Sequence, residues 1–161
     1  GDTVWFEFVG GSTGWAAFSD YAPNSCSCYL STALTSNSPS TWTPLNLDMA
    51  HFDIGGLHDT TNGRINIRRK GQYLVEVSVR PHNGVPVGEV FYGRALADGS
   101  VPFALDYQRN SHSFAHTIIM PKKTQKYVLS PGYLTLNFFA QSSVGVTGSS
   151  AETYLTITEI R

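Results

Sequence analysis

Charged side chains are scarce in this sequence. Of its 161 residues, 14% are Asp, Glu, Lys or Arg, and the formal net charge is -1. Soluble domains usually carry about a quarter of charged residues. So little net charge argues against electrostatic binding to nucleic acid or to an anionic membrane surface, and we expect no nucleic-acid partner. Aromatic residues, Thr, Ser and Gly replace the missing charge, as is typical of proteins that bury much of their surface in an assembly.

Long apolar runs are absent as well. No stretch is apolar for long enough to cross a bilayer, and no basic segment followed by an apolar one opens the chain. We therefore expect no membrane insertion. Because the sequence starts at Gly1 without a Met, we expect a processed product, a trimmed chain or part of a longer polypeptide.

Cysteine is limited to Cys26 and Cys28. Residues two apart in a strand point the same way, but a disulfide between them would be strained. We therefore predict two free thiols. Structural zinc needs four ligands, and a second cysteine pair is missing, so these two residues do not form a zinc site by themselves.

Catalytic patterns are also missing. His58-Asp59 with Asp53 nearby is interpreted as a polar turn held by hydrogen bonds, because an acid-base or metal site would need further ligands. None of the many serines lies in a Gly-x-Ser-x-Gly elbow. Calcium is a minority alternative, because its three candidate carboxylates lack a recognisable spacing. The carboxylates considered for calcium are Glu89, Asp98 and Asp106. The main prediction is that the protein is not an enzyme and has no catalytic residue, no cofactor and no metal.

Short alternating segments are what the sequence does contain. The clearest runs from Gln72 to Arg80, where Tyr73, Val75, Val77 and Val79 share one face. Ile65 and Ile67 alternate with polar residues just before it, after an Asn62-Gly63 turn signal, so the two segments are interpreted as a hairpin. Pro102 predicts an edge or bulged strand, and a further strand is expected over 113–120. Many short strands and no helical period predict an all-β sandwich or jelly roll.

Two segments near the C-terminus are apolar on both faces. Leu134, Leu136 and Phe138 fall on one face of the first, and Leu155 and Ile157 on one face of the second. A strand that is apolar on both sides should be covered on both, so a neighbouring subunit is expected to cover the second face. The predicted interface residues on those second faces are Tyr133, Phe139, Tyr154 and Ile160.

Several short motifs occur in the same order as in a known protein family. They are His51-Phe52-Asp53-Ile54-Gly55-Gly56-Leu57-His58-Asp59, then Asn62-Gly63-Arg64-Ile65, Gly71-Gln72-Tyr73-Leu74-Val75, Leu129-Ser130-Pro131-Gly132-Tyr133-Leu134-Thr135-Leu136 and Thr153-Tyr154-Leu155-Thr156-Ile157. This run, with 28–30 and 42–45 upstream, resembles the complement/tumour-necrosis-factor-like globular head, particularly the versions at the ends of bacteriophage fibres. The resemblance covers 23–161. Tyr133 stands where the family usually has Asp, and 1–22 has no counterpart.

The resemblance implies a jelly roll of about ten antiparallel strands that assembles as a homotrimer and acts in recognition without catalysis. Residues 23–161 would form this head, and 1–22 would be an N-terminal extension that packs on the body or on a neighbour. Receptors would be bound by loops and by grooves between subunits. The candidates in or beside predicted loops are His82, Asn83, Tyr92, Arg94, Tyr107, Arg109 and Ser111.

The function expected first is that of a bacteriophage virion protein, the head of a tail or head fibre that binds a host glycan or surface protein. Its partners would then be two further copies and other virion proteins, and its location the virion. Two alternatives remain open: a capsid or tail decoration protein that stabilises the virion, and a secreted or cell-surface ligand of the same fold.

Overall fold

The computed structural model describes residues 1, 3–7, 15–19, 23–109 and 123–160. These residues contain strands and loops but no helix, and therefore no helix that could cross a membrane. The strands are β1 (Thr3–Glu7), β2 (Trp15–Ser19), β3 (Ser25–Tyr29), β4 (Thr41–Leu45), β5 (Met49–Ile54), β6 (His58–Asp59), β7 (Arg64–Ile67), β8 (Gly71–Ser78), β9 (Val90–Ala97), β10 (Val101–Arg109), β11 (Lys123–Leu129), β12 (Gly132–Ala140) and β13 (Tyr154–Ile160).

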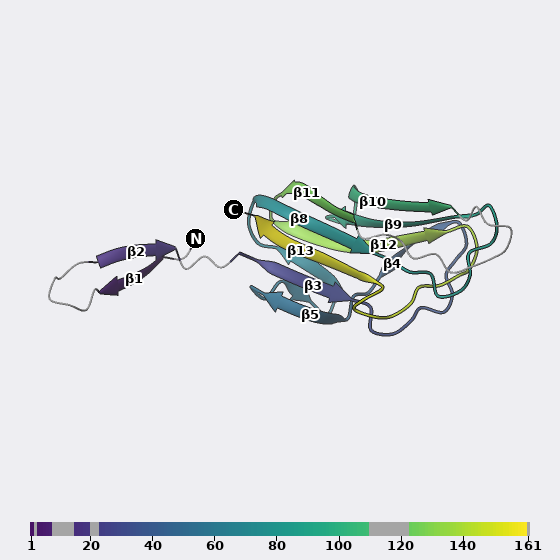
Figure 1. Ribbon diagram of the computed structural model, residues 1–161, viewed down its shortest axis with the longest axis horizontal. Helices are drawn as coiled ribbons and strands as arrows, with labels where there is room; N and C mark the ends of the chain where they lie inside the picture. The colour runs from purple at the N-terminus through teal and green to yellow at the C-terminus, as the bar shows by residue number, and fades with distance from the viewer. Residues whose placement is uncertain (2, 8–14, 20–22, 110–122, 161) are drawn as a thin grey trace.

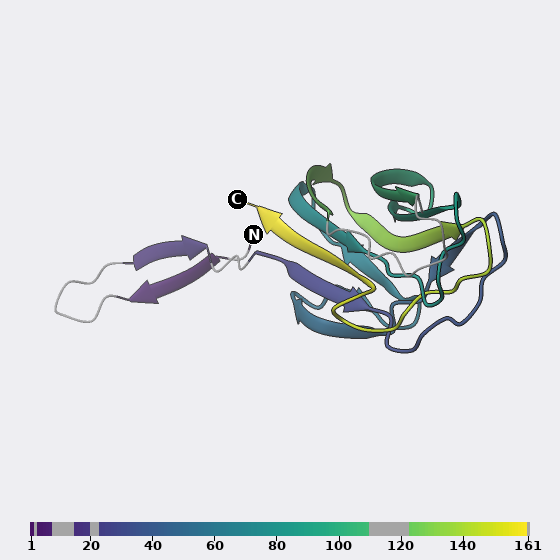
Figure 2. The ribbon, with the colours of Figure 1, turned by 45° about the vertical axis from the view of Figure 1, so that its right-hand side comes forward.

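Strands β3 to β13 form two antiparallel sheets (Figures 1 and 2). The five-stranded sheet has the order β11-β8-β13-β3-β5. The six-stranded sheet has the order β10-β9-β12-β7-β6, and β4 pairs with the second half of β12, next to β7. Neighbouring strands in each sheet are mostly far apart in the sequence. This arrangement confirms the predicted all-β jelly roll.

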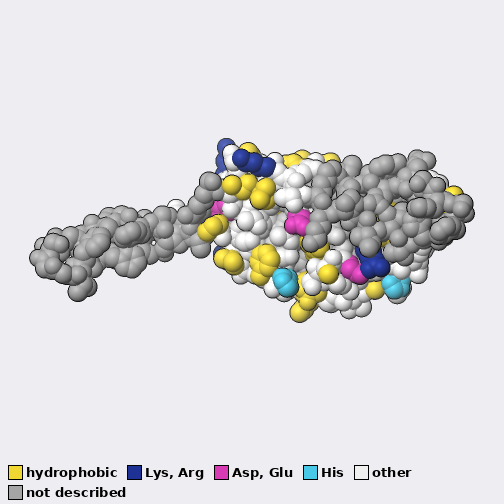
Figure 3. Space-filling model, in the orientation of Figure 1, with side chains coloured by type: hydrophobic (Ala, Val, Ile, Leu, Met, Phe, Trp, Pro, Cys, Tyr) yellow, Lys and Arg dark blue, Asp and Glu magenta, His cyan; other side chains and the backbone are white. Residues whose placement is uncertain are grey.

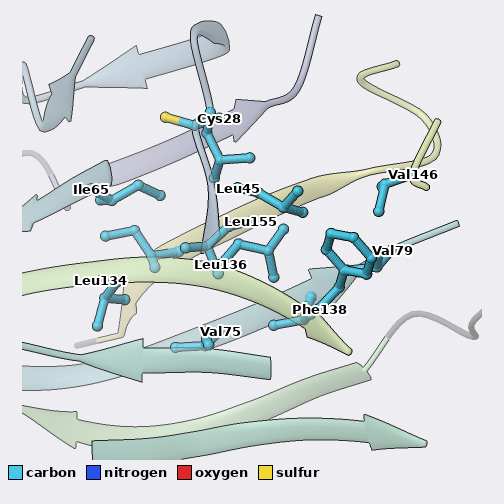
Figure 4. Packing of buried hydrophobic residues seen from close by; sticks show 14 of the residues in the cluster. Cys28, Leu45, Ile65, Val75, Val79, Leu134, Leu136, Phe138, Val146 and Leu155 are labelled. Atoms are coloured by element: carbon cyan, nitrogen blue, oxygen red, sulfur yellow. The ribbon is translucent and has the colours of Figure 1, made fainter. Parts of the chain in front are cut away.

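The core lies between the two sheets because alternate residues of each strand point inward. Val75 and Leu155 enter it from the five-stranded sheet, and Leu136 and Phe138 enter it from the six-stranded sheet (Figure 4). Phe138 stacks on Phe91, with ring centroids 5.9 Å apart. Rigid packing of this kind fixes which side chains of each strand face outward.

Both cysteines belong to this core. Cys26 and Cys28 are buried free thiols on β3, as predicted, and their sulfur atoms lie 3.3 Å apart. The contact with Cys28, together with burial, raises the pKa of the Cys26 thiol, which keeps it protonated.

The predicted hairpin of 65–67 with 72–80 is wrong. Strand β7 pairs with β6 and β12, whereas β8 pairs with β11 and β13, so the two strands lie in different sheets. Residues 68–70 connect the six-stranded sheet to the five-stranded sheet. Both strands bury one apolar face, which is all that the alternating pattern reports, because a period of two says nothing about the hydrogen-bonding partner.

The prediction made for the strand that contains Pro102 is confirmed. Strand β10 is at the edge of its sheet, and its register with β9 shifts between Pro102 and Ala104, which confirms the expected edge or bulged strand. The strand predicted over 113–120 lies outside the described residues.

Strands β1 and β2 form a hairpin of their own. Thr3 to Glu7 pairs with Trp15 to Ser19, and within the described residues neither strand pairs with the sandwich. Figure 1 shows the hairpin beyond the end of the sandwich at which β3 begins. Packing of 1–22 on the body or on a neighbour stays a prediction.

Candidate functional site

The outward surface of the five-stranded sheet is unusually apolar. Five of its side chains are large hydrophobics that are at least 38% exposed, whereas such residues are normally scattered singly over a surface. We call this surface the five-stranded face. Its exposed hydrophobic residues are Met49, Phe52, Ile54, Leu74 and Val128. These residues lie on β5, β8 and β11, and Figure 3, which looks onto this face, shows apolar patches on it.

The register explains how these residues come to share one surface. Leu74 on β8 is opposite Lys126 on one side and Thr158 on the other, and the row continues through Ser25 to Ile54. The neighbouring rows end in Phe52 and Met49 in the same way. Apolar side chains thus flank a centre that is built mainly of hydroxyls.

The polar groups in this centre satisfy one another. Ser27 Oγ and Thr156 Oγ1 lie 2.6 Å apart, and Ser25 Oγ and Thr158 Oγ1 lie 3.2 Å apart. Tyr154 is only 5% exposed and donates its hydroxyl proton to Glu76 Oε1 at 2.8 Å. Burial and the nearby Glu76 carboxylate raise the pKa of Tyr154, so this hydroxyl stays protonated. Because their hydrogen bonds are internal, these groups can be covered at little cost.

The outward surface of the six-stranded sheet carries a second feature, an aromatic cluster formed by Trp42, Tyr92, Phe139 and Arg94. The centroid of Trp42 lies 5.6 Å from that of Phe139 and 6.1 Å from that of Tyr92, and Tyr92 meets Phe139 edge-on at 5.6 Å. The guanidinium of Arg94 lies over the indole of Trp42, 3.6 Å from its centroid. Burial lowers the pKa of Arg94.

Pairing with β12 assembles this cluster from three strands. Phe139 is opposite Trp42 of β4 on one side and Tyr92 of β9 on the other. Arg94 is opposite Asn137 of β12, which is buried and donates from Nδ2 to Thr135 Oγ1 at 3.3 Å. Long-range strand pairing therefore gathers residues that are nearly a hundred positions apart.

The same sheet has a second arginine over an aromatic ring. The guanidinium of Arg64 lies 4.3 Å from the centroid of Tyr133, and its Nε donates to Asp59 Oδ2 at 2.9 Å. Asp59 also accepts hydrogen bonds from the backbone and the side chain of Asn62. Those hydrogen bonds from Asn62, followed by Arg64, lower the pKa of Asp59.

The four predicted interface residues lie on opposite sides of the sandwich. Tyr154 and Ile160 point outward from the five-stranded sheet, since Leu155 and Ile157 point into the core. Tyr133 and Phe139 belong to the six-stranded sheet, where they contact the side chains of Arg64 and of Trp42 and Tyr92. The second face of β12 is thus covered in part by its own chain.

The predicted receptor contacts are also divided. Tyr92 and Arg94 lie in the middle of β9 and Tyr107 lies within β10, so these three are not loop residues, whereas Arg109 is the last residue of β10. Receptor binding by these residues stays a prediction. These positions are paired within the six-stranded sheet: Tyr107 is opposite Tyr92. His82 and Asn83 do lie in the loop after β8, where Asn83 Nδ2 donates to Thr35 O at 3.4 Å. Ser111 lies outside the described residues.

The structure confirms the polar turn at His58 and Asp59. The Asp53 carboxylate accepts hydrogen bonds from the backbone N–H groups of Leu57 and His58, at 2.7 and 3.1 Å. His58 Nε2 lies 2.7 Å from Leu47 O. All three side chains therefore fasten a loop to the sheet.

The calcium candidates do not come together. Glu89 precedes β9 and Asp98 follows it, while Asp106 is opposite Gly93 near the middle of that strand. Asp98 Oδ1 accepts from the Tyr133 backbone N–H at 3.0 Å. Within the described ranges no three His, Cys, Asp or Glu residues are grouped so that they could hold a metal ion.

Two parts of these surfaces were not predicted from the sequence: Trp42 and the exposed residues of β5. Trp42 was not a candidate, because a lone aromatic among Thr and Pro gives no sign of its partners. The exposed residues of β5 also escaped selection, although 49–54 holds three large apolar residues. A signal did exist for them: Phe52 and Ile54 are two apart and flank Asp53, the alternation of a strand.

The fold predicted from the sequence motifs is shared with solved structures, although no family model matches the chain and no curated protein is significantly similar to it. Among solved structures, Eiger TNF from S. frugiperda is similar with a TM-score of 0.61 and 9% identity over 87% of this chain and 94% of that one. Murine APRIL at pH 8.0 is similar with a TM-score of 0.62 and 11% identity over 86% of this chain and 100% of that one. Murine APRIL at pH 5.0 gives a TM-score of 0.61, also at 11% identity and 86% of this chain. The chain therefore has a TNF-like jelly-roll fold.

Proposed function

We propose that this chain is a recognition head without catalytic activity, a ligand of the TNF-like fold that assembles as a homotrimer and binds a surface protein. The observation that carries the proposal is the apolar five-stranded face. A second and a third copy are the occupants of that face, and the outer surfaces of the trimer remain available for the receptor.

The composition of the face suits an interface between copies. Its rim is apolar, with Val128, Leu74 and Ile54 exposed, and its central hydroxyls already hydrogen-bond to each other. Covering such a surface removes apolar area from water, at about 25 cal/mol for each Å². It leaves few polar groups without partners, which favours lasting association.

The comparisons favour a ligand over a virion component. The similar structures are Eiger TNF and murine APRIL, and none of the three is named as a virion protein. They support the third alternative, a secreted or cell-surface ligand, better than a fibre head or a decoration protein. Location in a virion stays a prediction from the sequence resemblance.

Aspartate substitutions on the five-stranded face test the assembly. Ile54→Asp and Val128→Asp place a charge at side chains that are 52% and 66% exposed in the single chain. The matched controls are Val87→Asp and Val101→Asp, at 51% and 59% exposure, which lie outside this face. Substitutions at such exposed positions change the stability of a monomer by about 0.5 kcal/mol or less. Any difference between the pairs therefore reports on association.

Light scattering coupled to size exclusion provides the measurement. We expect the wild type and both control variants at three times the chain mass, and both face variants at the monomer mass with unchanged circular dichroism. A monomeric wild type at micromolar concentration, or face variants that stay trimeric, would contradict the assembly.

A further inference from the structure

The two arginine–aromatic stacks on the six-stranded sheet differ in one respect. Arg64 lies over Tyr133 and is neutralised by Asp59 at 2.9 Å. Arg94 lies over Trp42 at 3.6 Å but has no carboxylate within ion-pair distance in the described part of the chain. Among the described residues, the same surface thus contains one arginine with an ion-pair partner and one without.

Arg94 is also incompletely hydrogen-bonded. Its Nε is buried and, among the described residues and their contacts, has no acceptor. Removing a charged group from water is costly unless hydrogen bonds or an opposite charge compensate for it. Stacking on an aromatic ring returns about 0.5 to 2 kcal/mol, which compensates only in part. An acceptor with negative charge on the terminal nitrogens would supply a counter-charge that the described residues do not provide.

The surroundings of Arg94 match the centre of a protein–protein interface. Trp, Tyr and Arg are the residues that most often carry binding energy there, and they lie together within one cluster. The cluster is half-buried and rests on three paired strands, so its geometry is fixed before a partner arrives. A fixed surface pays little ordering entropy on binding.

We propose that Trp42, Tyr92, Arg94 and Phe139 form a docking site for a protein partner that inserts an Asp or Glu side chain, flanked by apolar residues, against the Arg94 guanidinium. The site lies on the outside of the proposed trimer, because the five-stranded face is on the other side of the sandwich. That partner's identity as a receptor rests on the proposed function, whereas the chemistry of the site does not.

A protein fits this site better than a sugar. A sugar ring stacks on an open, flat aromatic face, but one face of the Trp42 indole is already covered by Arg94. The rings of Tyr92 and Phe139 are tilted by 45° and 50° to the indole, so the cluster offers no continuous platform. Carboxylates bind guanidinium groups in a bidentate, charge-assisted manner, which suits an acidic side chain.

The test uses the full chain and a displayed library of random twelve-residue peptides. Peptides are selected on the wild type and counter-selected on Arg94→Gln, which keeps the side chain polar but removes the charge. Selected peptides are then synthesised with each Asp or Glu in turn replaced by Asn or Gln. Dissociation constants are measured by fluorescence polarisation against wild type, Arg94→Gln and Arg64→Gln. Arg64→Gln is the matched control, because this arginine also stacks on an aromatic ring but already has its carboxylate.

We expect selected peptides to share an acidic residue between apolar ones. Replacing that acid by its amide should weaken binding about tenfold or more, the loss expected for a charge-assisted hydrogen bond. Arg94→Gln should weaken binding by a similar factor and make it insensitive to the amide replacement, as a double-mutant cycle for a direct pair requires. Arg64→Gln should leave the dissociation constant within about twofold, since removing an uninvolved charge changes only long-range attraction.

Three results would overturn the docking site: no peptide survives the counter-selection, amide peptides bind the wild type as well as acidic ones, or sialylated and sulfated oligosaccharides bind the cluster when peptides do not. The amide comparison is made on the wild type, so it stands even if Arg94→Gln does not fold. A trimer that binds no acidic peptide would remove this site and leave the assembly intact. A monomer that binds the acidic peptides would contradict the assembly and leave the docking site intact.

Discussion

Gly63 lies in the turn between β6 and β7, and its backbone is in the left-handed region at φ +58°. A Cβ at this position would lie 2.0 Å from Asn46 Oδ1 and 2.6 Å from the backbone N of Leu47. Both the conformation and the close approach therefore require glycine. The sequence predicted the turn from Asn62-Gly63, but the close approach of 46–47 could not be predicted, since it depends on how the loop packs back.

Gly63→Ala should destabilise the fold by about 2 to 4 kcal/mol, because left-handed strain is joined by overpacking against the neighbouring backbone. The matched control is Gly88→Ala. Gly88 has φ +78°, but none of the described residues comes within 4 Å of the place that an added methyl group would take, so only the strain of about 1 kcal/mol applies. Urea denaturation of both variants provides the free energies of unfolding. Equal losses in the two variants would contradict the role of the close approach.

Strand β12 shows what alternation can and cannot predict. Its inward residues, Leu134, Leu136 and Phe138, were correctly assigned to a buried face. Its second face was correctly recognised as apolar, but the contact with Trp42 was missed, because strand register across nearly a hundred residues is not encoded in either segment alone. The same limit made β7 and β8 look like a hairpin. The local pattern predicts which side chains of a strand are buried, whereas the strand that pairs with it depends on long-range packing.

The two faces of β12 should respond differently to truncation. Phe138→Ala removes a fully buried ring and should cost about 3 to 5 kcal/mol, while Phe139→Ala removes a half-buried ring and should cost about 1 to 3 kcal/mol. Denaturant titrations measure both losses, and light scattering gives the mass of each variant. If the trimer forms through the five-stranded face, Phe139→Ala keeps its mass. A monomeric Phe139→Ala would restore the interface predicted from the sequence.

On the scale of the whole molecule, the sandwich and the N-terminal hairpin are separate in their hydrogen bonding. Within the described residues, β1 and β2 pair with each other, and the sandwich begins its own pairing at Ser25. The boundary predicted between residues 22 and 23 stays a prediction.

Deletion of 1–22 should leave the melting temperature of the remainder within a few degrees and its assembled mass at three chains, since no ladder of the sandwich is removed. Differential scanning calorimetry and light scattering of the shortened chain test this expectation. A large fall in melting temperature, or dissociation, would show instead that the extension packs on the body or on a neighbour.

The position of β13 has a consequence for how the molecule is made. This last strand is the central member of its sheet, held between β8 and β3, and β3 is the first strand of the sandwich. While a ribosome still holds residues 154–160, the edges of β3 and β8 have no partner, and the apolar core cannot close. The sandwich can then close only after β13 has left the ribosome, and it folds at the slow rates typical of proteins dominated by long-range contacts. Any product that stops short of this strand would expose two open strand edges and be prone to aggregate.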